Sequence, residues 1–430
     1  MKQETKFKDT EIGLIPVDWN VEVFSNVIAI NPKRDIKKGT TARKISMQNL
    51  IEFKRKIDGF ELSEFKGGSK FQNEDTLMAR ITPCLENGKT AYVDILEDNE
   101  IAFGSTEFIV LSGKDNLTRN DFVYYLAISP KIRRIAIQSM TGTSGRQRIQ
   151  ADLLGDVEIG IPSLEEQHRI AKILSDLDSK IELLQKQNKT IEAIGQALFK
   201  QWFVDFEFPN EEGKPYKSSG GEMVDSELGT IPKDWKVNQL KDFGDIICGK
   251  TPPKSNKEYF EGDIPFIKIP DMHNQLFVIN TEDSLTKEGK EYQENKTIPE
   301  KSICVSCIAT VGLVSLTSKE SQTNQQINSI IPKNSYSTYY LHYMFKSMYQ
   351  LLQDYGSGGS ATLNINTKTF SKIKVLSPKD EVIKEFHKRV NSIFDKILDN
   401  LNENNILSQI RDLLLPKLMS GKIRVPVEVE

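Results

Sequence analysis

The sequence predicts an α+β protein with two mixed α/β domains separated by two long antiparallel helices of coiled-coil type, arranged as a pseudo-twofold repeat. Two observations support this prediction. The phrase Gly-x-Ile-Pro-x-Asp-Trp begins at Gly13 and again at Gly229, and Pro162 is followed by Pro378 at the same interval. Long helical periodicity follows each of these prolines. A period of this length exceeds that of solenoids and propellers, so the repeated unit is a whole domain with its spacer.

The first domain, residues 1–162, contains runs that predict strands and one run that predicts a helix. Phe108–Leu111 and Val157–Ile159 are short, rich in β-branched residues and bounded by polar residues, as strands commonly are. The apolar spacing between Asp121 and Ile128 is that of a helix. The domain is therefore expected to be of mixed type.

Residues 163–208 predict a first spacer helix. Ser163 stands three residues before Glu166, which is the spacing of a capping box. Apolar residues then recur at steps of three and four until Pro209, as in a coiled-coil seam. The predicted seam positions are Leu174, Leu177, Ile181, Leu184, Asn188 and Ile191.

Residues 209–221 are rich in proline, glycine and serine and predict a linker. The second domain, residues 222–377, repeats the mixed plan. Strands are predicted at Ile303–Ile308 and Ile373–Val375, and a helix at Tyr339–Leu352.

The interiors of the two domains do not align at one interval. Leu77–Ile81 matches Cys304–Ile308 best, and this interval is longer than the one that separates the opening phrases and the closing prolines. The second domain therefore has extra residues early and loses them again later. Variable segments between fixed ends are where recognition commonly lies.

Residues 378–425 predict a second spacer helix and a C-terminal segment. Its seam positions follow those of the first helix at the interval of the paired prolines, at Val390, Ile393, Ile397, Asn404 and Leu407. An asparagine in such a seam commonly fixes register at some cost in stability. Pro416 lacks the amide donor of a helix interior, so it predicts an end or a kink near Leu415.

Neither helix can bury its apolar stripe alone. The simplest prediction is that the two helices pack on each other, because both stripes are narrow and of matched length. The alternative is that each helix folds back on its own domain.

Composition and charge restrict the class of protein. The chain has 430 residues and a net charge of −3, from 57 basic and 60 acidic side chains, and no segment is strongly basic. The electrostatic footprint usual for a nucleic-acid binder is thus absent at this level, although a local basic stripe remains possible. Four cysteines favour a reducing compartment, and the N-terminus lacks the apolar run of a signal peptide. The cytoplasm is the expected location.

The motifs that could carry chemistry are incomplete. The pair Cys304 and Cys307 has metal spacing, but no second pair accompanies it, so no metal site is predicted. Asn31-Pro32 lacks the aromatic residue of an amino-methyltransferase motif. Glu212-Gly213-Lys214 has nuclease-like lettering but lies in the predicted linker, where a rigid metal site is not expected. No catalytic residue is predicted.

Several phrases resemble those of the specificity (S) subunits of type I restriction-modification systems. They are the paired openings already described, the run Ile161–Ile170 and the later Gln201–Phe206. Gly104–Phe108 and Thr323–Asn328 resemble phrases of the target recognition domains in that family. The resemblance covers nearly the whole chain in the order domain, helix, domain, helix, and it is weakest at the start of the second helix.

The resemblance implies a non-catalytic, cytoplasmic subunit in which each target recognition domain reads one half of a bipartite site in double-stranded DNA. The helices would set the unspecified gap between the halves and dock two methylation subunits. The implied chemistry resides in partners: methylation subunits carrying S-adenosylmethionine, and restriction/translocase subunits using ATP and Mg. No cofactor and no membrane are implied for this chain.

Base reading calls for arginine or lysine toward guanine and asparagine or glutamine toward adenine. Loop positions with such donors are the predicted DNA-binding residues, although an ordinary surface role is equally open for each. They are Arg80, Thr82, Asn87, Lys89, Arg146 and Arg148 in the first domain, and Lys250, Thr251, Lys254, Lys268, Asn324, Gln325 and Gln326 in the second.

Two other classes of function remain open from the sequence. The first is a coiled-coil scaffold that pairs two protein ligands, which the near-neutral charge favours. The second is a self-contained nuclease or methyltransferase.

Overall fold

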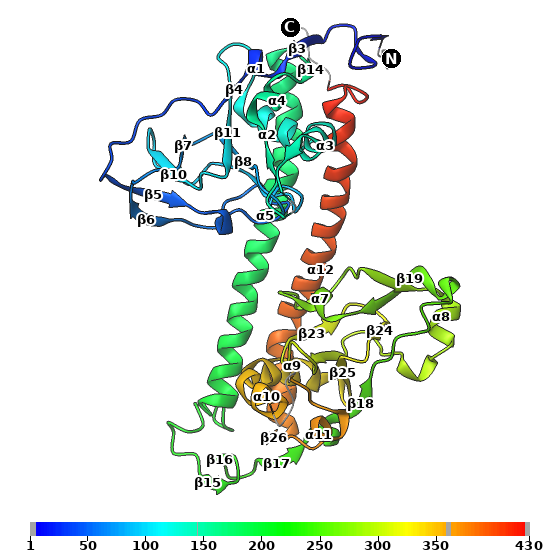
Figure 1. Cartoon of the computed structure of the whole chain (residues 1–430). Coiled ribbons are helices and arrows are strands. Elements are labelled where there is room, and N and C mark those ends of the chain that lie inside the picture. The colour runs from blue at the N-terminus through cyan, green and yellow to red at the C-terminus, as the bar shows by residue number, and fades with distance from the viewer. Residues whose placement is uncertain (1–5, 144, 358–362, 426–430) are drawn as a thin grey trace. The chain divides into compact units, whose positions relative to one another are not determined.

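The computed structural model describes residues 6–143, 145–357 and 363–425. It divides into two compact units (Figure 1). One unit consists of Met1–Glu182 with Ile406–Glu430, and the other of Leu183–Asn405. Two long helices run through both units, so each unit contains one domain and one part of each helix.

In the first unit, a sheet in the order β4-β11-β8-β9 lies between two apolar clusters. Adjacent residues of β8, Leu77 and Met78, enter different clusters, because successive side chains of a strand point to opposite faces. The strands are β4 Ile28–Ile30, β8 Thr76–Ala79, β9 Thr90–Tyr92 and β11 Phe108–Gly113.

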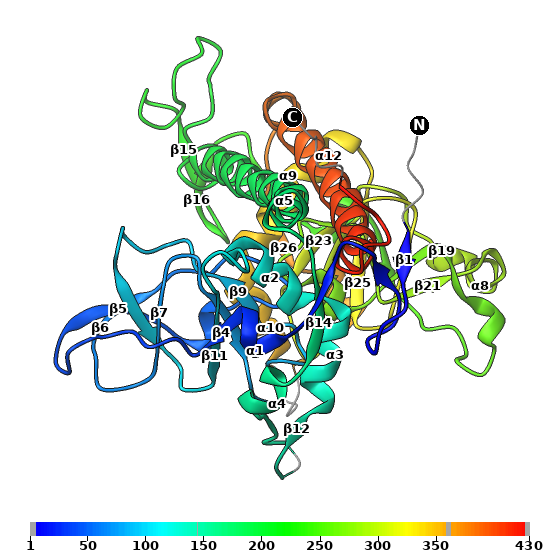
Figure 2. The same ribbon diagram turned by 90° about the horizontal axis from the view of Figure 1, so that it is seen from above.

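A second sheet of the first unit, in the order β6-β5-β10-β7, lies on the side away from α3 (Figures 1 and 2). Its Ile45, Phe71 and Ala102 fill the cluster that Leu77 enters. The strands are β5 Thr41–Ile45, β6 Glu61–Glu64, β7 Ser69–Gln72 and β10 Ile101–Gly104.

Helices and short strands complete the first unit. The closing strand β14 pairs antiparallel with β3, so the two ends of the domain are joined in one ladder. The remaining elements are β1 Phe7–Lys8, β2 Ile15–Pro16, β3 Asn20–Val23, α1 Phe24–Val27, α2 Asn120–Ile128, α3 Pro130–Gln138, β12 Met140–Thr141, β13 Arg148–Ile149, α4 Ala151–Gly155 and β14 Glu158–Ile161.

The second unit has a five-stranded sheet in the order β18-β25-β22-β23-β20 and a three-stranded sheet in the order β21-β19-β24. Here too the closing strand β26 pairs antiparallel with an early strand, β17. The strands are β15 Met223–Ser226, β16 Gly229–Pro232, β17 Lys236–Gln239, β18 Gly244–Cys248, β19 Phe260–Ile267, β20 Phe277–Val278, β21 Asp283–Leu285, β22 Ile303–Ser306, β23 Val314–Thr317, β24 Gln322–Thr323, β25 Ile327–Pro332 and β26 Lys374–Ser377.

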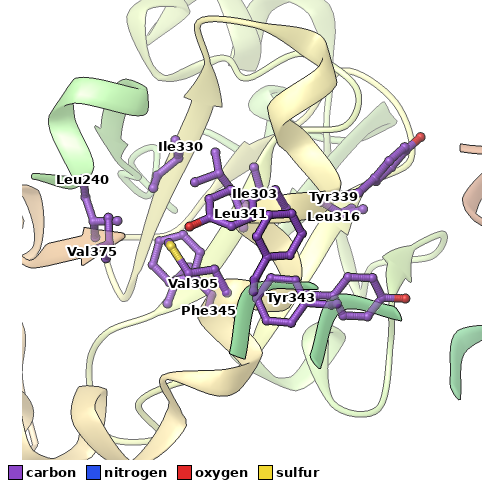
Figure 3. Packing of buried hydrophobic residues seen from close by; sticks show 14 of the residues in the cluster. Leu240, Ile303, Val305, Leu316, Ile330, Tyr339, Leu341, Tyr343, Phe345 and Val375 are labelled. Atoms are coloured by element: carbon purple, nitrogen blue, oxygen red, sulfur yellow. The ribbon is translucent and has the colours of Figure 1, made fainter. Parts of the chain in front are cut away.

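The main core of the second unit forms where α9 covers one face of β22 and β25 (Figure 3). Ile303 and Val305 of β22 point to the same face as Ile330 of β25, and Tyr343 and Phe345 of α9 pack over them. The helices are α6 Leu240–Phe243, α7 Ile269–Met272, α8 Lys287–Glu291, α9 Thr338–Ser347, α10 Tyr349–Gly356 and α11 Thr367–Ser371. The prediction of one helix over Tyr339–Leu352 is therefore wrong, because the helix is interrupted at Met348, between α9 and α10.

The long helices are α5, Leu164–Phe199, and α12, Asp380–Met419. A π-helical turn over Lys200–Val204 extends α5. The helix does not end near Leu415, since α12 continues past Pro416 to Met419; the alternative prediction, a kink there, stays a prediction. The turn beyond the proline is kept by the backbone bond from Ser420 N to Pro416 O, 3.2 Å, and by Leu418 packing in the first unit's core.

Within each unit the two long helices contact each other, in antiparallel order. In the first unit Arg411 of α12 bonds Asp178 of α5, and in the second unit Asn400 of α12 bonds Asn188 of α5. The helices also pack on the domains, because Ile170 and Leu415 both enter the core of the first. Both interpretations of the apolar stripes therefore apply: the helices pack on each other and also on the domains. The predicted α+β repeat with two long helices is confirmed.

Among the described residues, no helix has both the length and the apolar character needed to cross a membrane.

Candidate nucleic-acid interface

Three separate segments of the first domain meet at the end of β8. The backbone N–H of Arg80 donates to Glu107 O at 3.0 Å, and Arg80 O accepts from Ile149 N at 2.9 Å. Thr82 N donates to Gln147 O at 3.1 Å. These bonds bring predicted residues from 80–82 and 146–148 together with the turn that precedes β11.

Charged side chains cover this junction. Arg148 donates through Nε to both oxygens of Glu107 at 3.0 Å and through Nη2 to Oε1 at 2.7 Å. The hydrogen bond from Arg148 is the main cause that lowers the pKa of the Glu107 carboxyl, and the charge of Arg80 adds to it. Arg80 keeps a buried Nε that has no hydrogen-bond partner. The charges of two guanidinium groups thus act on the Glu107 carboxylate, and Arg148 is the one that is hydrogen-bonded to it.

The other predicted residues of the first domain lie beside this junction or turn away from it. Arg146 is exposed on the adjoining loop, and Thr82 bonds Gln147 O. Asn87 bonds Glu52, while Lys89 donates to the carbonyl of Met47. The side chain of Lys89 therefore holds η1, Met47–Asn49, and that of Asn87 holds the loop after it.

The second domain has the same backbone junction. Cys307 N donates to Gln326 O at 2.8 Å, Cys307 O accepts from Ile365 N at 2.8 Å, and Ala309 N donates to Leu363 O at 3.0 Å. Each bond has its counterpart in the first domain. Arg80 aligns with Cys307 when Leu77–Ile81 is placed on Cys304–Ile308. The loop residues Gln147 to Ile149 align with Leu363 to Ile365 at the interval that separates Pro162 from Pro378. Arg80, Glu107 and Arg148 are thus equivalent to Cys307, Gln326 and Asn364.

A further loop joins the junction of the second domain. Lys250 N donates to Thr323 O at 2.9 Å, and Thr251 Oγ1 donates to Gln325 Oε1 at 2.7 Å. Only glycine fits at 249, since a Cβ there would lie 2.2 Å from Thr323 Oγ1. The structure therefore gathers residues predicted at 250–251 and at 324–326.

The remaining predicted residues of the second domain differ in how strongly they are held. Asn324 is buried, and its side chain bonds both Gln326 Oε1 and the Gln326 N–H. Lys268 forms ion pairs with Glu282 and Asp283, which raise its pKa against the opposing effect of burial. Lys254 is exposed.

Glu107 and Asn364 are site residues that sequence reasoning missed. An alignment of Gly104–Phe108 with Thr323–Ile327 would have brought Glu107 opposite Gln326. No local feature marks Asn364, which pairs with Ile308 in an isolated bridge equivalent to that of Ile81 with Arg148.

The predicted seam residues vary in burial. Leu177, Ile191, Ile393 and Leu407 are only half-buried, whereas Asp178 and Phe394, one residue after Leu177 and Ile393, are buried. The seam positions that are buried are Leu174, Ile181, Leu184, Asn188, Val390, Ile397 and Asn404.

The described residues contain no group of three or more His, Cys, Asp or Glu side chains placed to hold a metal ion. Burial raises the pKa of the Cys304 thiol to about 12 and that of Cys307 to about 11, so neither is a thiolate near neutral pH. The two junctions offer guanidinium and amide donors, which suit base edges and phosphates.

Comparison with known proteins identifies the family. A model described as "Type I restriction modification DNA specificity domain" matches residues 20–193 and 232–412. The HindI specificity subunit of Haemophilus influenzae is 42% identical over 403 residues, covering 81% of this chain and 86% of that protein. The MjaIX specificity subunit of Methanocaldococcus jannaschii is 26% identical, covering 98% and 97%.

A solved structure agrees with the fold. The S subunit of a type I restriction-modification system from M. genitalium has a TM-score of 0.59 at 16% identity, covering 97% of this chain and 99% of that one. Both family-model matches span one domain together with much of the long helix that follows it. The chain belongs to the family of type I restriction-modification DNA specificity subunits.

Proposed function

We propose that this chain is the non-catalytic DNA-specificity subunit of a type I restriction-modification complex. Residues 1–162 and 222–377 are the two target recognition domains, and each reads one half of a bipartite DNA site. The observation that carries the proposal is the equivalent backbone junction in both domains, which presents different side chains on the same frame.

The helical segments 163–208 and 378–425 set the unspecified gap between the half-sites, and linker 209–221 joins the first of them to the second domain. This role is supported by α5 and α12, each of which runs through both units as one helix. A stiff connection of fixed length is what a fixed spacing between two half-sites requires.

Two methylation subunits dock on the helices in this proposal. Ile406, Ile410 and Leu413 form an apolar stripe on α12, and their exposed fractions are 56%, 41% and 63%. Residues spaced in this way share one helix face, and a contiguous apolar surface commonly marks a protein contact. The methylation subunits supply S-adenosylmethionine and the methyl-transfer chemistry, and restriction/translocase subunits use ATP and Mg.

The domain assignment predicts modular specificity. Replacing residues 222–377 by the corresponding domain of the Haemophilus influenzae relative should change one half-site of the methylated motif and leave the other intact. The measurement is sequencing of methylated bases in DNA from cells that express the exchanged chain with its methylation subunits. A change in both halves, or methylation by the purified chain without partners, would contradict the proposal.

A further inference from the structure

We infer that Arg148, held in place by Glu107, contacts a guanine in the half-site read by the first domain. Glu107 is then a positioning residue, and Arg148 determines specificity at one base pair. The inference rests on the proposed DNA-reading function and adds the chemistry of one contact to it.

The ion pair leaves one edge of the Arg148 side chain available. The bonds to Glu107 use Nε and Nη2. A guanidinium has five N–H donors, so both donors of Nη1 and the second donor of Nη2 remain. The side chain is 41% exposed. Two parallel donors on a half-exposed guanidinium match O6 and N7 of guanine in the major groove.

The carboxylate of Glu107 restricts where that edge can point. Three hydrogen bonds from one guanidinium to one carboxylate fix the plane of the group before DNA arrives, which lowers the entropy lost on binding. A phosphate contact depends less on such orientation, because a flexible lysine can also provide it as a point charge. The charge of Arg80 also acts on Glu107, so two positive charges oppose one negative charge in this cluster.

The two junctions share their backbone hydrogen bonds but differ in their side chains. The backbone bonds of the junction are shared, yet Gln326 and Asn364 occupy the places of Glu107 and Arg148. If the ion pair were needed to hold the junction, the second domain would not form the same bonds with uncharged amides. The side chains are therefore free to encode which base is read.

The test uses the full chain, co-expressed with its methylation subunits, acting on unmethylated plasmid DNA. The half-site of the first domain is the one that the exchange of residues 222–377 leaves unchanged. In the wild type it should contain a specified G·C pair. R148K should relax that pair by roughly tenfold to a hundredfold, since a bidentate guanine contact contributes about 1–3 kcal/mol, while the second half-site is unaffected.

E107Q provides an independent variant that keeps Arg148. It should relax the same base pair by a smaller factor, because the guanidinium is present but less well oriented. E61Q and R43K are matched controls, since they alter ion pairs of Glu61 with Lys44 and of Arg43 with Glu97 in the same domain. Both controls should keep the wild-type motif.

Three results would overturn the inference. One is a first half-site without any specified G·C pair. Another is an unchanged motif in R148K, which indicates a phosphate contact, because lysine keeps the positive charge that such a contact needs. The third is E107Q indistinguishable from the wild type. Failure of the wild-type complex to bind or methylate DNA would instead overturn the proposed function itself.

Discussion

His342 is a polar side chain without a hydrogen-bond partner in the core of the second unit. Its ring contacts those of Tyr343 and Phe394, with centroids 5.3 and 5.8 Å away, and neither ring nitrogen is hydrogen-bonded. Burial, with a smaller contribution from the charge of Lys346, lowers the pKa of His342 to about 3. The imidazole is therefore neutral in the folded protein at any physiological pH.

The stability of the second unit should depend on pH through His342. The unfolded chain takes up a proton near pH 6.5 that the folded core excludes, so stability is full above pH 6.5 and falls as the pH drops toward 3. At pH 5 the loss is about 2 kcal/mol. H342L should remove this loss, as measured by urea unfolding at pH 7.5 and pH 5. F394L, which changes packing but not titration, should retain it, and an equal loss in H342L would show another origin.

Asp178 is a buried carboxylate on the seam of α5. It accepts hydrogen bonds from Tyr125 Oη at 2.7 Å and from Arg411 Nη1 at 2.8 Å, and its side chain is 5% exposed. D178N should reduce the free energy of unfolding by about 3 kcal/mol, because Arg411 then loses its buried counter-charge and keeps only the exposed Asp412. D176N is the matched control: its partner is the exposed Lys172, so the change should stay below about 0.5 kcal/mol. Equal effects in urea unfolding would contradict this account.

At the scale of elements, the long helices were largely predictable and their contacts were not. Steps of three and four residues predict α5 and α12, because a helix that buries one face must repeat its apolar residues at that period. The buried position of the seam moves to Asp178, because the ion pair with Arg411 stabilises a carboxylate there. The sequence alone does not predict a buried carboxylate at that position. Pro416 shows the same limit: local chemistry predicts a break, whereas packing of Leu418 keeps the helix.

The strands and the site were predictable only in part. Runs such as Phe108–Leu111 mark strands locally, but the ladder that joins β3 to β14 depends on residues distant in sequence. The candidate site has the same limit. Suitable donors on loops identify Arg148, whereas its partner Glu107 becomes visible only when the junction is assembled. DNA-binding residues are sought among hydrogen-bond donors, because the phosphates of DNA repel carboxylates. That search leaves out Glu107.

The helices should act as a ruler for the DNA site. Seven residues inserted between Glu182 and Leu183, with seven more between Asn405 and Ile406, lie at the boundary of the two units and leave the contacts inside each unit intact. Each helix lengthens by about 10 Å. The unspecified gap should therefore grow by about three base pairs at 3.4 Å each, with both half-sites unchanged in methylated-base sequencing.

The control for the ruler is seven extra residues in linker 209–221. This insertion lengthens the chain without lengthening either helix, so the gap should stay as in the wild type. A gap that ignores the helix insertions, or follows the linker, would show that something other than α5 and α12 sets the spacing.

The two halves of the molecule repeat one more feature. In each unit, the segment that follows a long helix packs against the domain and closes it. In the second unit Phe208 stacks on Trp235 with ring centroids 5.2 Å apart. In the first unit the equivalent position is Arg424, which pairs with Asp18 and with the buried Glu166. Glu166 also accepts a hydrogen bond from the indole of Trp19 at 3.0 Å. One closure is aromatic and the other ionic.

R424M should loosen the first unit and leave the second intact. It leaves the carboxylate of Glu166, whose side chain is 2% exposed, without its cation. We expect a loss of about 2 kcal/mol, seen as faster hydrogen exchange in β3 and β14 and unchanged exchange in residues 222–377. E166Q added to R424M should restore part of the protection. Faster exchange in both units would show that the closure stabilises the molecule as a whole.

The backbone junction at the end of β8 has a consequence for how such a protein acquires new targets in evolution. Its bonds join main-chain groups, as do those of the equivalent junction after β22, so exchanging the side chains there disturbs no ladder. In the proposed function, point mutation at these positions changes the half-site that is read, without rebuilding a domain. Randomising positions 80, 107 and 148, followed by selection for altered methylation, is the laboratory form of that process.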